Sequence, residues 1–499
     1  MSAITLTDRL SLATLAAATE RPGVSGPAVD PRALSIGIVH FGVGAFHRAH
    51  QAVFTEDAAA GAGDTRWGIL GVTGRSAKVK DQLESQDGLY SVLTKATDAT
   101  ALRVMGSMRK VAFPGVDSED VLRTLAAENV HLASLTITEK GYPRTPEGSL
   151  DLANPRVAAD VEALRAELFG RHFTGATRTP LGLLARGLAR RQSTSGAPFA
   201  VVCCDNLMSN GSVTRGLVMA LAEAAGAERL LEWIDSDVTF PSTMVDRIVP
   251  ATTESNREEA GRMLGLRDEG LVVAEPFGQW VIEDNFKVPR PEWERSGAVV
   301  TADVGVFEVA KLRMLNATHS LLAYLGALRG YPMIADAVTS DGLAQEARRL
   351  QRDDIIPTLT APPGTDLGEY GESILDRFAN PALGHTTLQV AMDGSQKLPV
   401  RVLGTVADRL ADGEVPQSAA LLVAAWMVFI YRGRDVNGRP LRLDDPMADL
   451  LRETAAGPEG GLVDRLLALR EIFPSDVAGN AGFRAAVTDA ARRLLYEIP

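Results

Sequence analysis

Cysteine is almost absent from this sequence of 499 residues: only Cys203 and Cys204 occur, and they are adjacent. Neighbouring cysteines suit neither a disulfide framework nor a four-ligand zinc site, which favours a reducing compartment. Long hydrophobic runs are missing too, because the longest, from Ala419 to Tyr431, falls short of the roughly 20 residues of a membrane-spanning helix. Charged residues interrupt the N-terminal segment, so no signal-peptide core is predicted. These absences predict a cytoplasmic protein without a membrane partner.

Positive charge is in deficit, with 51 lysines and arginines against 63 aspartates and glutamates and a formal net charge of -12. This balance argues against the broad basic surface of a nucleic-acid-binding protein, although it leaves room for a local basic pocket that binds a small anion. Histidine is also scarce. The seven histidines include one close pair, His47 and His50, and no evident third ligand for a catalytic zinc ion, so we expect no metal site.

Short apolar runs alternate with helical patterns in the first half of the chain. The expected strands are near-continuously apolar, as strands buried on both faces of a sheet must be. A strand, a helix and a second strand in succession predict parallel pairing with a right-handed crossover. Residues 1–290 are therefore expected to form a doubly wound, Rossmann-like α/β domain with an N-terminal extension. The expected strands are 35–41, 67–73, 130–136 and 199–204, and the first two are joined by a helix over 47–60.

The sequence changes in character after residue 290. Pro289 and Pro291 punctuate a polar stretch, and beyond Asp303 most segments have a 3.6-residue periodicity with few strand signals. Residues 291–499 are therefore expected to form a mostly α-helical second domain. Its expected helices include 308–325, 343–351, 417–431 and 463–472.

A glycine-rich turn, GVGAFH from Gly42 to His47, follows the first expected strand. Gly42 and Gly44 match the first two glycines of a dinucleotide fingerprint, which allow a tight turn and close approach of the backbone to a pyrophosphate. His47 stands in place of the third glycine. A purely structural turn is the alternative, but the position between a strand and a helix favours a cofactor loop made by Gly42, Gly44, Ala45 and Phe46.

The end of the second expected strand is where a dinucleotide-binding domain contacts the adenosine ribose. An acidic side chain there is typical of NAD, and a nearby arginine is typical of NADP. This region has no acid, and its candidate cofactor contacts are Thr73 and Arg75. Arg75 could face the adenine, a 2′-phosphate or only solvent. The residues alone therefore leave NAD and NADP both open.

Three polar residues, Lys311, Asn316 and His319, interrupt an apolar helical pattern from Val309 to Leu325. In an α-helix, Asn316 lies roughly 140° and His319 roughly 80° around the axis from Lys311, so the three share one broad face. A solvated helix face is the plain alternative, but the flanking residues are apolar. The trio suits proton transfer beside hydride transfer, because a lysine whose pKa is lowered by burial is able to accept the proton of an alcohol. An amide donor then stabilises the alkoxide by about 3 to 4 kcal/mol, and no metal ion is needed.

Seven segments spread over most of the chain resemble the long-chain mannitol dehydrogenase family. The Thr-Met-Val-Asp-Arg-Ile segment and the Lys-x4-Asn-x2-His spacing are the most specific marks of this resemblance. The segments are IVHFGVGAFHRAHQA from Ile38, SLTITEKGY from Ser134, CDNLMSNG from Cys204, VTFPSTMVDRIVP from Val238, EPFGQWVIEDNF from Glu275, KLRMLNATHSLLAYLG from Lys311 and AMDGSQKLP from Ala391.

The resemblance implies zinc-independent oxidation of a polyol or aldonate at C2, coupled to NAD, with a Rossmann domain and a helical C-terminal domain that enclose the substrate. It implies that Lys311 is the general base and that His319 binds substrate hydroxyls. Asn206 and Asn316 look like the pair that stabilises the oxyanion. A turn-forming role is the structural alternative for Asn206, which follows an expected strand.

The resemblance also marks substrate contacts. Asp246 and Lys397 look like contact residues, although Asp246 could instead form a buried ion pair with Arg247, and Lys397 could be solvated. Mannitol enzymes tend to carry an arginine eight residues before this lysine, where the present chain has Gln389. The segment therefore looks more like the fructuronate reductase branch, whose substrate bears a carboxylate, with Lys397 and Arg401 as the expected partners of that group.

The expected reaction is thus the NAD-dependent interconversion of D-mannonate and D-fructuronate. Mannitol and fructose, or another polyol and its ketose, are the alternative substrates. A dinucleotide-binding sensor without chemistry is the alternative of another class. We expect a monomer or a small homo-oligomer whose partners are small molecules.

Overall fold

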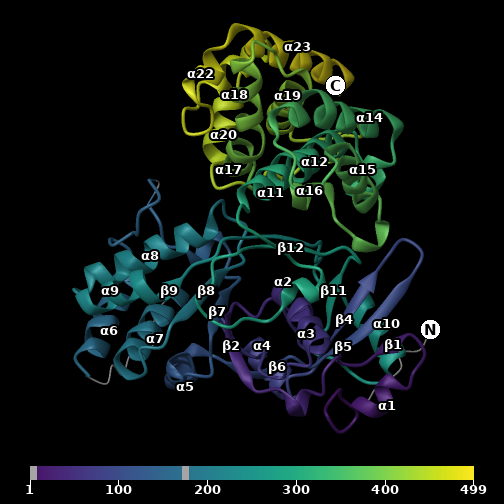
Figure 1. Ribbon diagram of the computed structural model, residues 1–499. Coiled ribbons are helices and arrows are strands. Elements are labelled where there is room, and N and C mark those ends of the chain that lie inside the picture. Colours follow the sequence, from purple (N-terminus) through teal and green to yellow (C-terminus); the bar gives the residue numbers. More distant parts are fainter. Residues whose placement is uncertain (1–7, 146, 171–178, 499) are drawn as a thin grey trace. The chain divides into compact units, whose positions relative to one another are not determined.

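The computed structural model describes residues 8–145, 147–170 and 179–498, and the chain divides into two compact units, 1–304 and 305–499 (Figure 1). The residues just after 290 remain attached to the first unit. There β13 (Val299–Thr301) pairs in parallel with β12 (Gln279–Glu283), and the second unit begins at Gly305 with a helix. Among the described residues, no helix combines the length and the apolar character needed to cross a membrane.

The first unit is built around a six-stranded parallel sheet. Its strands are β2 (Ile36–Phe41), β3 (Gly68–Val72), β6 (Met108–Ala112), β7 (Leu132–Leu135), β8 (Phe199–Cys203) and β9 (Val238–Thr239). They lie in the order β6-β3-β2-β7-β8-β9, which is 3-2-1-4-5-6 when these strands are counted along the chain. This is the doubly wound order, and its topological switch point lies between β2 and β7. The Rossmann-like fold class expected from the sequence is confirmed.

Helices cover both faces of this sheet. They are α2 (Ala45–Ala49), α3 (Gln51–Ala62), α4 (Lys78–Glu84), α5 (Pro114–Ala126), α6 (Pro155–Leu168), α7 (Pro180–Thr194), α8 (Asn210–Ala224) and α9 (Glu228–Asp237). On β2, Val39 and Phe41 enter one hydrophobic core with residues of α5 to α9, whereas Ile38 enters a second core with residues of α3. Burial on both faces explains why the strand sequences are almost continuously apolar.

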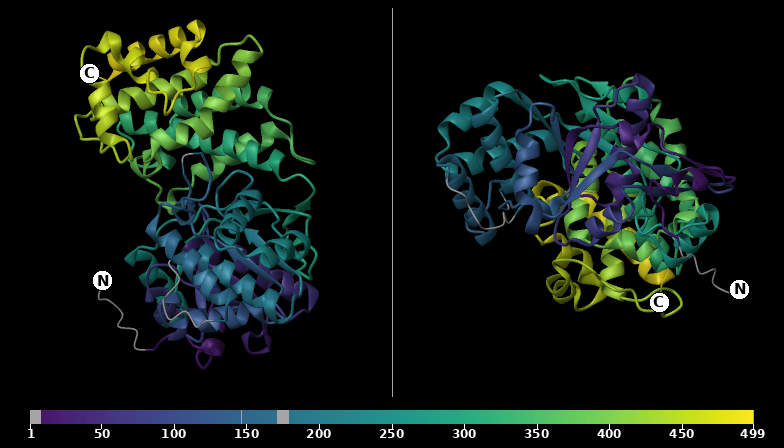
Figure 2. Two further views of the ribbon diagram at one scale, coloured as in Figure 1. Left: turned by 90° about the vertical axis from the view of Figure 1, so that its left-hand side faces the viewer. Right: turned by 90° about the horizontal axis from the view of Figure 1, so that it is seen from below.

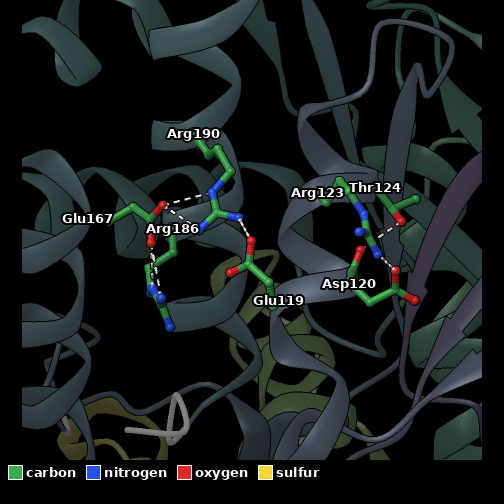
Figure 3. A network of polar contacts seen from close by, with 7 residues as sticks. All are labelled: Glu119, Asp120, Arg123, Thr124, Glu167, Arg186 and Arg190. Atoms are coloured by element: carbon green, nitrogen blue, oxygen red, sulfur yellow. Dashed lines mark hydrogen bonds and ion pairs between the residues drawn. The ribbon is translucent and has the colours of Figure 1, made fainter. Parts of the chain in front are cut away.

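Helices α5, α6 and α7 each begin with a proline, whose fixed φ suits the first helical position. A network of ion pairs joins the three helices (Figure 3). Glu167 of α6 accepts hydrogen bonds from Arg186 at 3.0 Å and from Arg190 at 2.7 Å, and Arg190 also reaches Glu119 of α5 at 2.5 Å. The Arg186 and Glu167 side chains are only 4% and 12% exposed, so this pair is buried in the helix layer.

Two smaller sheets and two further helices complete the first unit. The four-stranded sheet runs β1-β5-β4-β11, and the three-stranded sheet runs β10-β12-β13. A separate core lies between the four-stranded sheet, α1 and α10. The remaining elements are α1 (Leu15–Thr19), β1 (Val24–Ser25), β4 (Tyr90–Lys95), β5 (Thr100–Met105), β10 (Thr243–Asp246), α10 (Glu254–Leu264) and β11 (Val272–Ala274).

The described residues of the second unit, 305–498, form helices and loops without a strand, as expected from the 3.6-residue periodicity (Figure 2). Helices α12 and α19 are almost completely buried, and both α12 and α23 pack against α19. The helices are α11 (Gly305–Ala310), α12 (Ala317–Leu328), α13 (Ile334–Val338), α14 (Asp341–Arg349), α15 (Leu367–Phe378), α16 (Thr387–Ala391), α17 (Gly394–Leu398), α18 (Gly404–Ala411), α19 (Gln417–Arg432), α20 (Ala448–Ala455), α21 (Leu462–Leu467), α22 (Ser475–Gly479) and α23 (Ala481–Glu497).

The single helix predicted over 47–60 is wrong, because the chain breaks there into α2 and α3. His50 lies between them with φ -126° and ψ -89°, outside the helical region. Its ring Nε2 lies 2.8 Å from the carbonyl oxygen of Gln279, and its ring stacks on Phe46 at 5.0 Å. These contacts from distant and neighbouring residues hold His50 in the break.

Candidate functional site

The glycine turn begins at the topological switch point of the six-stranded sheet. Gly42 has φ +99°, and a Cβ atom added to it would lie 2.0 Å from the carbonyl oxygen of Thr136. Its N–H donates to the carbonyl of Val72 at 2.9 Å, while the N–H of Thr136 donates to the carbonyl of Phe41 at 2.8 Å. Gly42 therefore fits between the ends of three parallel strands, where no other residue has room.

Gly44 occupies a different environment from Gly42. Its φ of -79° and ψ of 179° suit any residue, and the nearest atom to an added Cβ would be the Gly42 carbonyl oxygen at 3.9 Å. The backbone at Gly44 is therefore exposed, and an added Cβ would fill open space beside the start of α2, where Ala45 and Phe46 follow. This open space fits the close backbone approach that a dinucleotide pyrophosphate requires.

Thr73 and Arg75 follow the end of β3, as expected. Thr73 is buried, and its N–H donates to the carbonyl of Ala112 at 2.8 Å. Its hydroxyl is also buried and has no hydrogen-bond partner among the described residues. A ribose hydroxyl would satisfy such an orphaned group. Arg75 is exposed and carries no such indication.

The ends of β7 and β8 are joined by Asp205, which the sequence analysis did not single out. Its carboxylate accepts hydrogen bonds from the N–H groups of Ile137 at 2.9 Å and Thr138 at 2.7 Å, and from the hydroxyl of Tyr142 at 2.7 Å. Thr138 is held at φ 61° and ψ 162°, a strained conformation for a β-branched residue. Burial raises the pKa of Asp205 to about 6. The following residue, Asn206, is exposed at the carboxyl end of the sheet.

The sequence does contain a signal for Asp205, because a carboxylate directly after a buried parallel strand lies at the ligand-binding edge of such a sheet.

Asp246 lies elsewhere in the first unit. It is buried at the end of β10, where it pairs with Gln279. The neighbouring Arg247 donates to the carbonyls of Glu275 at 2.8 Å and Ala49 at 2.5 Å.

The lysine helix of the second unit contains a π-helical segment, η4 (Lys311–Asn316), between α11 and α12. In a π-helix the N–H of residue i+5 bonds to the carbonyl of residue i, and such turns occur frequently at functional sites. Lys311 and Asn316 are five residues apart and span this wider turn. The angles expected from α-helical geometry are therefore wrong for this pair, because the widened turn brings the two residues closer to one face.

In η4 and α12, two buried polar groups have no hydrogen-bond partner among the described residues: the side-chain Nδ2 of Asn316 and the Nε2 of His319. The His319 ring stacks on Phe378 at 4.4 Å and lies 5.8 Å from the ring of His385. Burial holds the pKa of His319 well below its usual value, and nearby positive charges lower it further. The neutral imidazole and the amide are both ready to bond a polar ligand.

The groups whose charged forms lower the pKa of His319 are His385, Arg401, Lys397 and Arg377, in decreasing order, and burial lowers the pKa of His385 itself. Lys397 donates to the carbonyl of Val390 at 3.2 Å. Arg401 lies in a second π-helical segment, η8 (Pro399–Leu403), which packs against η4. The guanidinium of Arg401 donates to Ser320 Oγ at 3.1 Å and to the carbonyl of Asn316 at 3.4 Å.

The second unit thus brings together five residues predicted from the sequence and adds two that the prediction missed. The predicted ones are Lys311, Asn316, His319, Lys397 and Arg401. Arg377 and His385 were missed, since they lie on other segments and no local motif marks them. Gln389 forms a capping box with Thr386 at the start of α16 and thereby has a structural role.

Among the described residues, no group of three or more histidine, cysteine, aspartate or glutamate side chains is arranged to hold a metal ion. Both cysteines are buried free thiols. The sulfur of Cys203 lies 2.9 Å from the hydroxyl of Tyr142.

Comparison with known families and proteins gives consistent matches over the whole chain. Residues 36–295 match the model of the mannitol dehydrogenase Rossmann domain, and residues 303–495 match the mannitol dehydrogenase C-terminal domain. A D-mannonate oxidoreductase of Escherichia coli is 41% identical over 477 residues, covering 94% of this chain and 96% of that protein. A mannitol 2-dehydrogenase of Pyrenophora tritici-repentis is 33% identical over 466 residues, covering 92% and 80%.

Two solved structures are similar over almost the full length. The ternary complex of Pseudomonas fluorescens mannitol 2-dehydrogenase with NAD and D-mannitol has a TM-score of 0.85 at 34% identity and covers 98% of this chain and 97% of that one. A D-sorbitol dehydrogenase in substrate-free form has a TM-score of 0.86 at 31% identity, with 98% and 100% covered.

Proposed function

The chain belongs to the mannitol dehydrogenase family of oxidoreductases, and from this premise we propose that it interconverts the C2 alcohol and ketone of a sugar acid, with D-mannonate and D-fructuronate as the substrate pair and NAD as the cofactor. The observation that carries the proposal is the position of Arg401, whose guanidinium donates to Ser320 Oγ and to the carbonyl of Asn316 on the helix of His319, with Lys397 four residues before it. A polyol has no charge for these groups to bind, whereas the carboxylate of a sugar acid does.

The first unit supports the cofactor part of the proposal. The residues proposed to hold NAD are Gly42, Gly44, Ala45 and Phe46 in the glycine loop, with Thr73 at the end of β3. The open space beside Gly44 and the orphaned hydroxyl of Thr73 fit a dinucleotide. When bound, NAD accepts the hydride from C2 of the alcohol. We propose NAD rather than NADP because of the family resemblance. Arg75 could instead contact the 2′-phosphate of NADP, so the assay described below includes both cofactors.

The second unit supports the chemical part. We assign Lys311 as the general base that takes the hydroxyl proton as C2 becomes a carbonyl carbon. The unpartnered amide of Asn316 donates a hydrogen bond to the oxygen on C2, where negative charge develops during the transfer. The unpartnered Nε2 of His319 binds a substrate hydroxyl. Asn206 keeps the oxyanion-stabilising role, and Asp246 the substrate contact, that the family resemblance implies.

In the reverse direction the same residues act in the opposite sense. Protonated Lys311 donates a proton to the oxygen while the ketone carbon receives the hydride, so alcohol and ketone differ by one hydride and one proton. Lys397, Arg401 and Arg377 are proposed to orient the carboxylate. Orientation of this kind favours one end of the sugar acid and therefore places C2, rather than another carbinol carbon, at the reacting position.

The test is a nicotinamide absorbance assay with NADH or NADPH and either D-fructuronate or D-fructose, followed by D-mannonate, mannitol, arabinitol and sorbitol in the oxidative direction. We expect kcat/KM for fructuronate to exceed that for fructose by about 100-fold or more, since a charge-assisted hydrogen bond to a carboxylate contributes about 1.5 to 3 kcal/mol and several cations act together.

Lys397→Met should remove most of that preference while leaving turnover of fructose nearly unchanged. Arg409→Met, at a partly buried arginine on α18 near Asp412, provides the matched loss of one positive charge in the same unit. Equal or greater turnover of fructose and mannitol by the wild-type protein would refute the sugar-acid assignment and make the protein a polyol dehydrogenase. Cofactor binding without turnover of any substrate in the panel would instead favour a sensor.

A further inference from the structure

Two histidine rings lie face to face beneath the glycine turn. His40 is on β2, two residues before Gly42, and His47 is the third residue of α2. Their ring centroids are 3.3 Å apart and their planes differ by 11°. Neither side chain is more than 1% exposed. His47 occupies the position at which the dinucleotide fingerprint has its third glycine, so an aromatic ring stands here in place of a residue without a side chain.

Hydrogen bonds fix the orientation of the His40 ring. Its Nδ1 lies 2.8 Å from Ser134 Oγ, and its Nε2 lies 2.8 Å from Thr136 Oγ1. The Thr136 hydroxyl donates in turn to the carbonyl of Gly42 at 2.8 Å. Since that hydroxyl uses its proton on Gly42, it accepts from Nε2–H, and Nδ1 accepts from Ser134. One chain of hydrogen bonds therefore runs from β7 through His40 and back to the glycine turn.

This arrangement favours two neutral imidazoles. A proton on Nδ1 of His40 would face the hydroxyl of Ser134, and two positive rings at this separation would repel each other. Burial lowers the pKa of His40 to about 3, and burial followed by the charges of His40 and Arg48 lowers that of His47. The stacked pair therefore stays neutral and closely packed throughout the physiological pH range.

The third glycine of the fingerprint normally permits close packing of the helix on the strand. Here the flat ring of His47 lies on His40 and takes over that contact, so α2 is packed on β2 through two rings. The Gly42 carbonyl receives the end of the hydrogen-bond chain, and the Gly44 N–H donates to the same carbonyl at 2.6 Å. The orientation of the Gly44 peptide is therefore coupled to the ring stack.

We propose that His47 is a positioning residue for the dinucleotide: its ring, stacked on His40, fixes the glycine turn in the conformation that receives the pyrophosphate. This inference rests on the proposed dinucleotide-dependent function. It assigns a role to the one residue of the loop that departs from the fingerprint. The proposed role does not involve contact with the reacting atoms, because His47 acts on the cofactor only through Gly42 and Gly44.

The decisive variant is His47→Gly, which restores the third glycine of the fingerprint. On this proposal it weakens binding of NADH at least tenfold and raises KM for NAD by a similar factor, while kcat at saturating cofactor stays within about twofold. His47→Phe keeps a flat neutral ring on His40 and is expected to bind NADH within about threefold of the wild type. If His47 were an incidental replacement, His47→Gly would bind NADH as tightly as the wild type or more tightly.

Two controls keep the result interpretable. His131→Gly removes a partly buried histidine at the opposite, amino end of β7 and is expected to leave NADH binding unchanged. Ser134→Ala leaves His47 intact but removes the partner of His40 Nδ1, and it should weaken NADH binding about threefold through the same chain. This second variant decides the matter if His47→Gly does not fold.

Affinity is measured by the fluorescence of NADH on titration with each purified variant, and folding by urea denaturation. Unchanged NADH affinity in both His47→Gly and Ser134→Ala overturns this inference and leaves the proposed function intact. A wild-type protein that binds neither NADH nor NADPH overturns the proposed function and the positioning role together. Equal losses of kcat in His47→Gly and His47→Phe would show a general structural role and would also overturn the inference.

Discussion

Replacing Gly42 or Gly44 with alanine adds the same methyl group to the cofactor loop at two positions with opposite structural consequences. At Gly42 the new Cβ would lie 2.0 Å from the carbonyl oxygen of Thr136, and φ is +99°. An unfavourable backbone conformation costs about 1 to 3 kcal/mol, and displacing the neighbouring strand end adds about 1 to 3 kcal/mol. We therefore expect Gly42→Ala to lower the free energy of unfolding by about 2 to 6 kcal/mol and to weaken binding of NADH as well.

At Gly44 the added methyl group meets no protein atom closer than 3.9 Å, and φ is -79°. The free energy of unfolding should therefore change by less than about 0.5 kcal/mol. The methyl group would nevertheless occupy the space assigned to the pyrophosphate. We expect the dissociation constant of NADH to rise at least about tenfold, which corresponds to about 1.4 kcal/mol.

The assay combines urea unfolding, followed by tryptophan fluorescence, with titration of NADH. Gly216→Ala is the matched control, because Gly216 lies in α8, where an added Cβ meets no atom within 4 Å. It should raise stability slightly, by up to about 1 kcal/mol, without affecting NADH. Wild-type affinity in Gly44→Ala would refute the assignment of the glycine loop as the pyrophosphate site. Wild-type stability in Gly42→Ala would refute the steric reasoning at the switch point.

Three further outcomes are expected. Lys311→Ala should lower kcat by about 10²- to 10⁴-fold while the dissociation constant of NADH stays unchanged, and near-wild-type turnover would exclude Lys311 as the base. Because the pKa of His40 is lowered from 6.5 to about 3, the unfolded chain takes up the proton first as pH falls. The free energy of unfolding should therefore fall by about 4 to 5 kcal/mol between pH 6.5 and 3, and a flat profile in urea titrations would contradict this burial. Glu167→Gln should lower the free energy of unfolding by about 2 to 3 kcal/mol, because it removes the buried carboxylate that pairs with both Arg186 and Arg190. The exposed Glu162→Gln on the same helix should lower it by less than about 0.5 kcal/mol, and equal effects in urea unfolding would show that burial of the network does not matter.

The parallel sheet was predictable because each of its central strands is buried on both faces. A short apolar run between turn residues, such as 199–204, predicts a buried strand, and β8 covers Phe199–Cys203. The two smaller sheets were not predicted. Their strands are short, and β4 pairs with β11 across about 180 residues of chain, so nothing local identifies the partners. The break at His50 has the same origin, since the carbonyl that holds its ring belongs to Gln279.

Some residues of the candidate site are likewise predictable from local sequence, whereas others depend on contacts between distant parts of the chain. The Lys-x4-Asn-x2-His spacing is local, so the sequence alone is enough to single out Lys311, Asn316 and His319. It is not enough to predict their mutual arrangement, because the angle between them depends on the π-helical turn. Arg377 and His385 gain their meaning only from tertiary packing around His319.

The π-helical turn at 311–316 determines the direction of Lys311 relative to the residues that follow, whereas the helix itself could form without this turn. If residues 311–316 took up ordinary α-helical hydrogen bonding without a change of length, the residues beyond them would rotate by about 100° relative to Lys311. A substitution that removes the wider turn would therefore yield a chain that keeps its helices but presents Lys311 and Asn316 on different sides. On the proposed mechanism, activity would then be lost although Lys311, Asn316 and His319 were all still present.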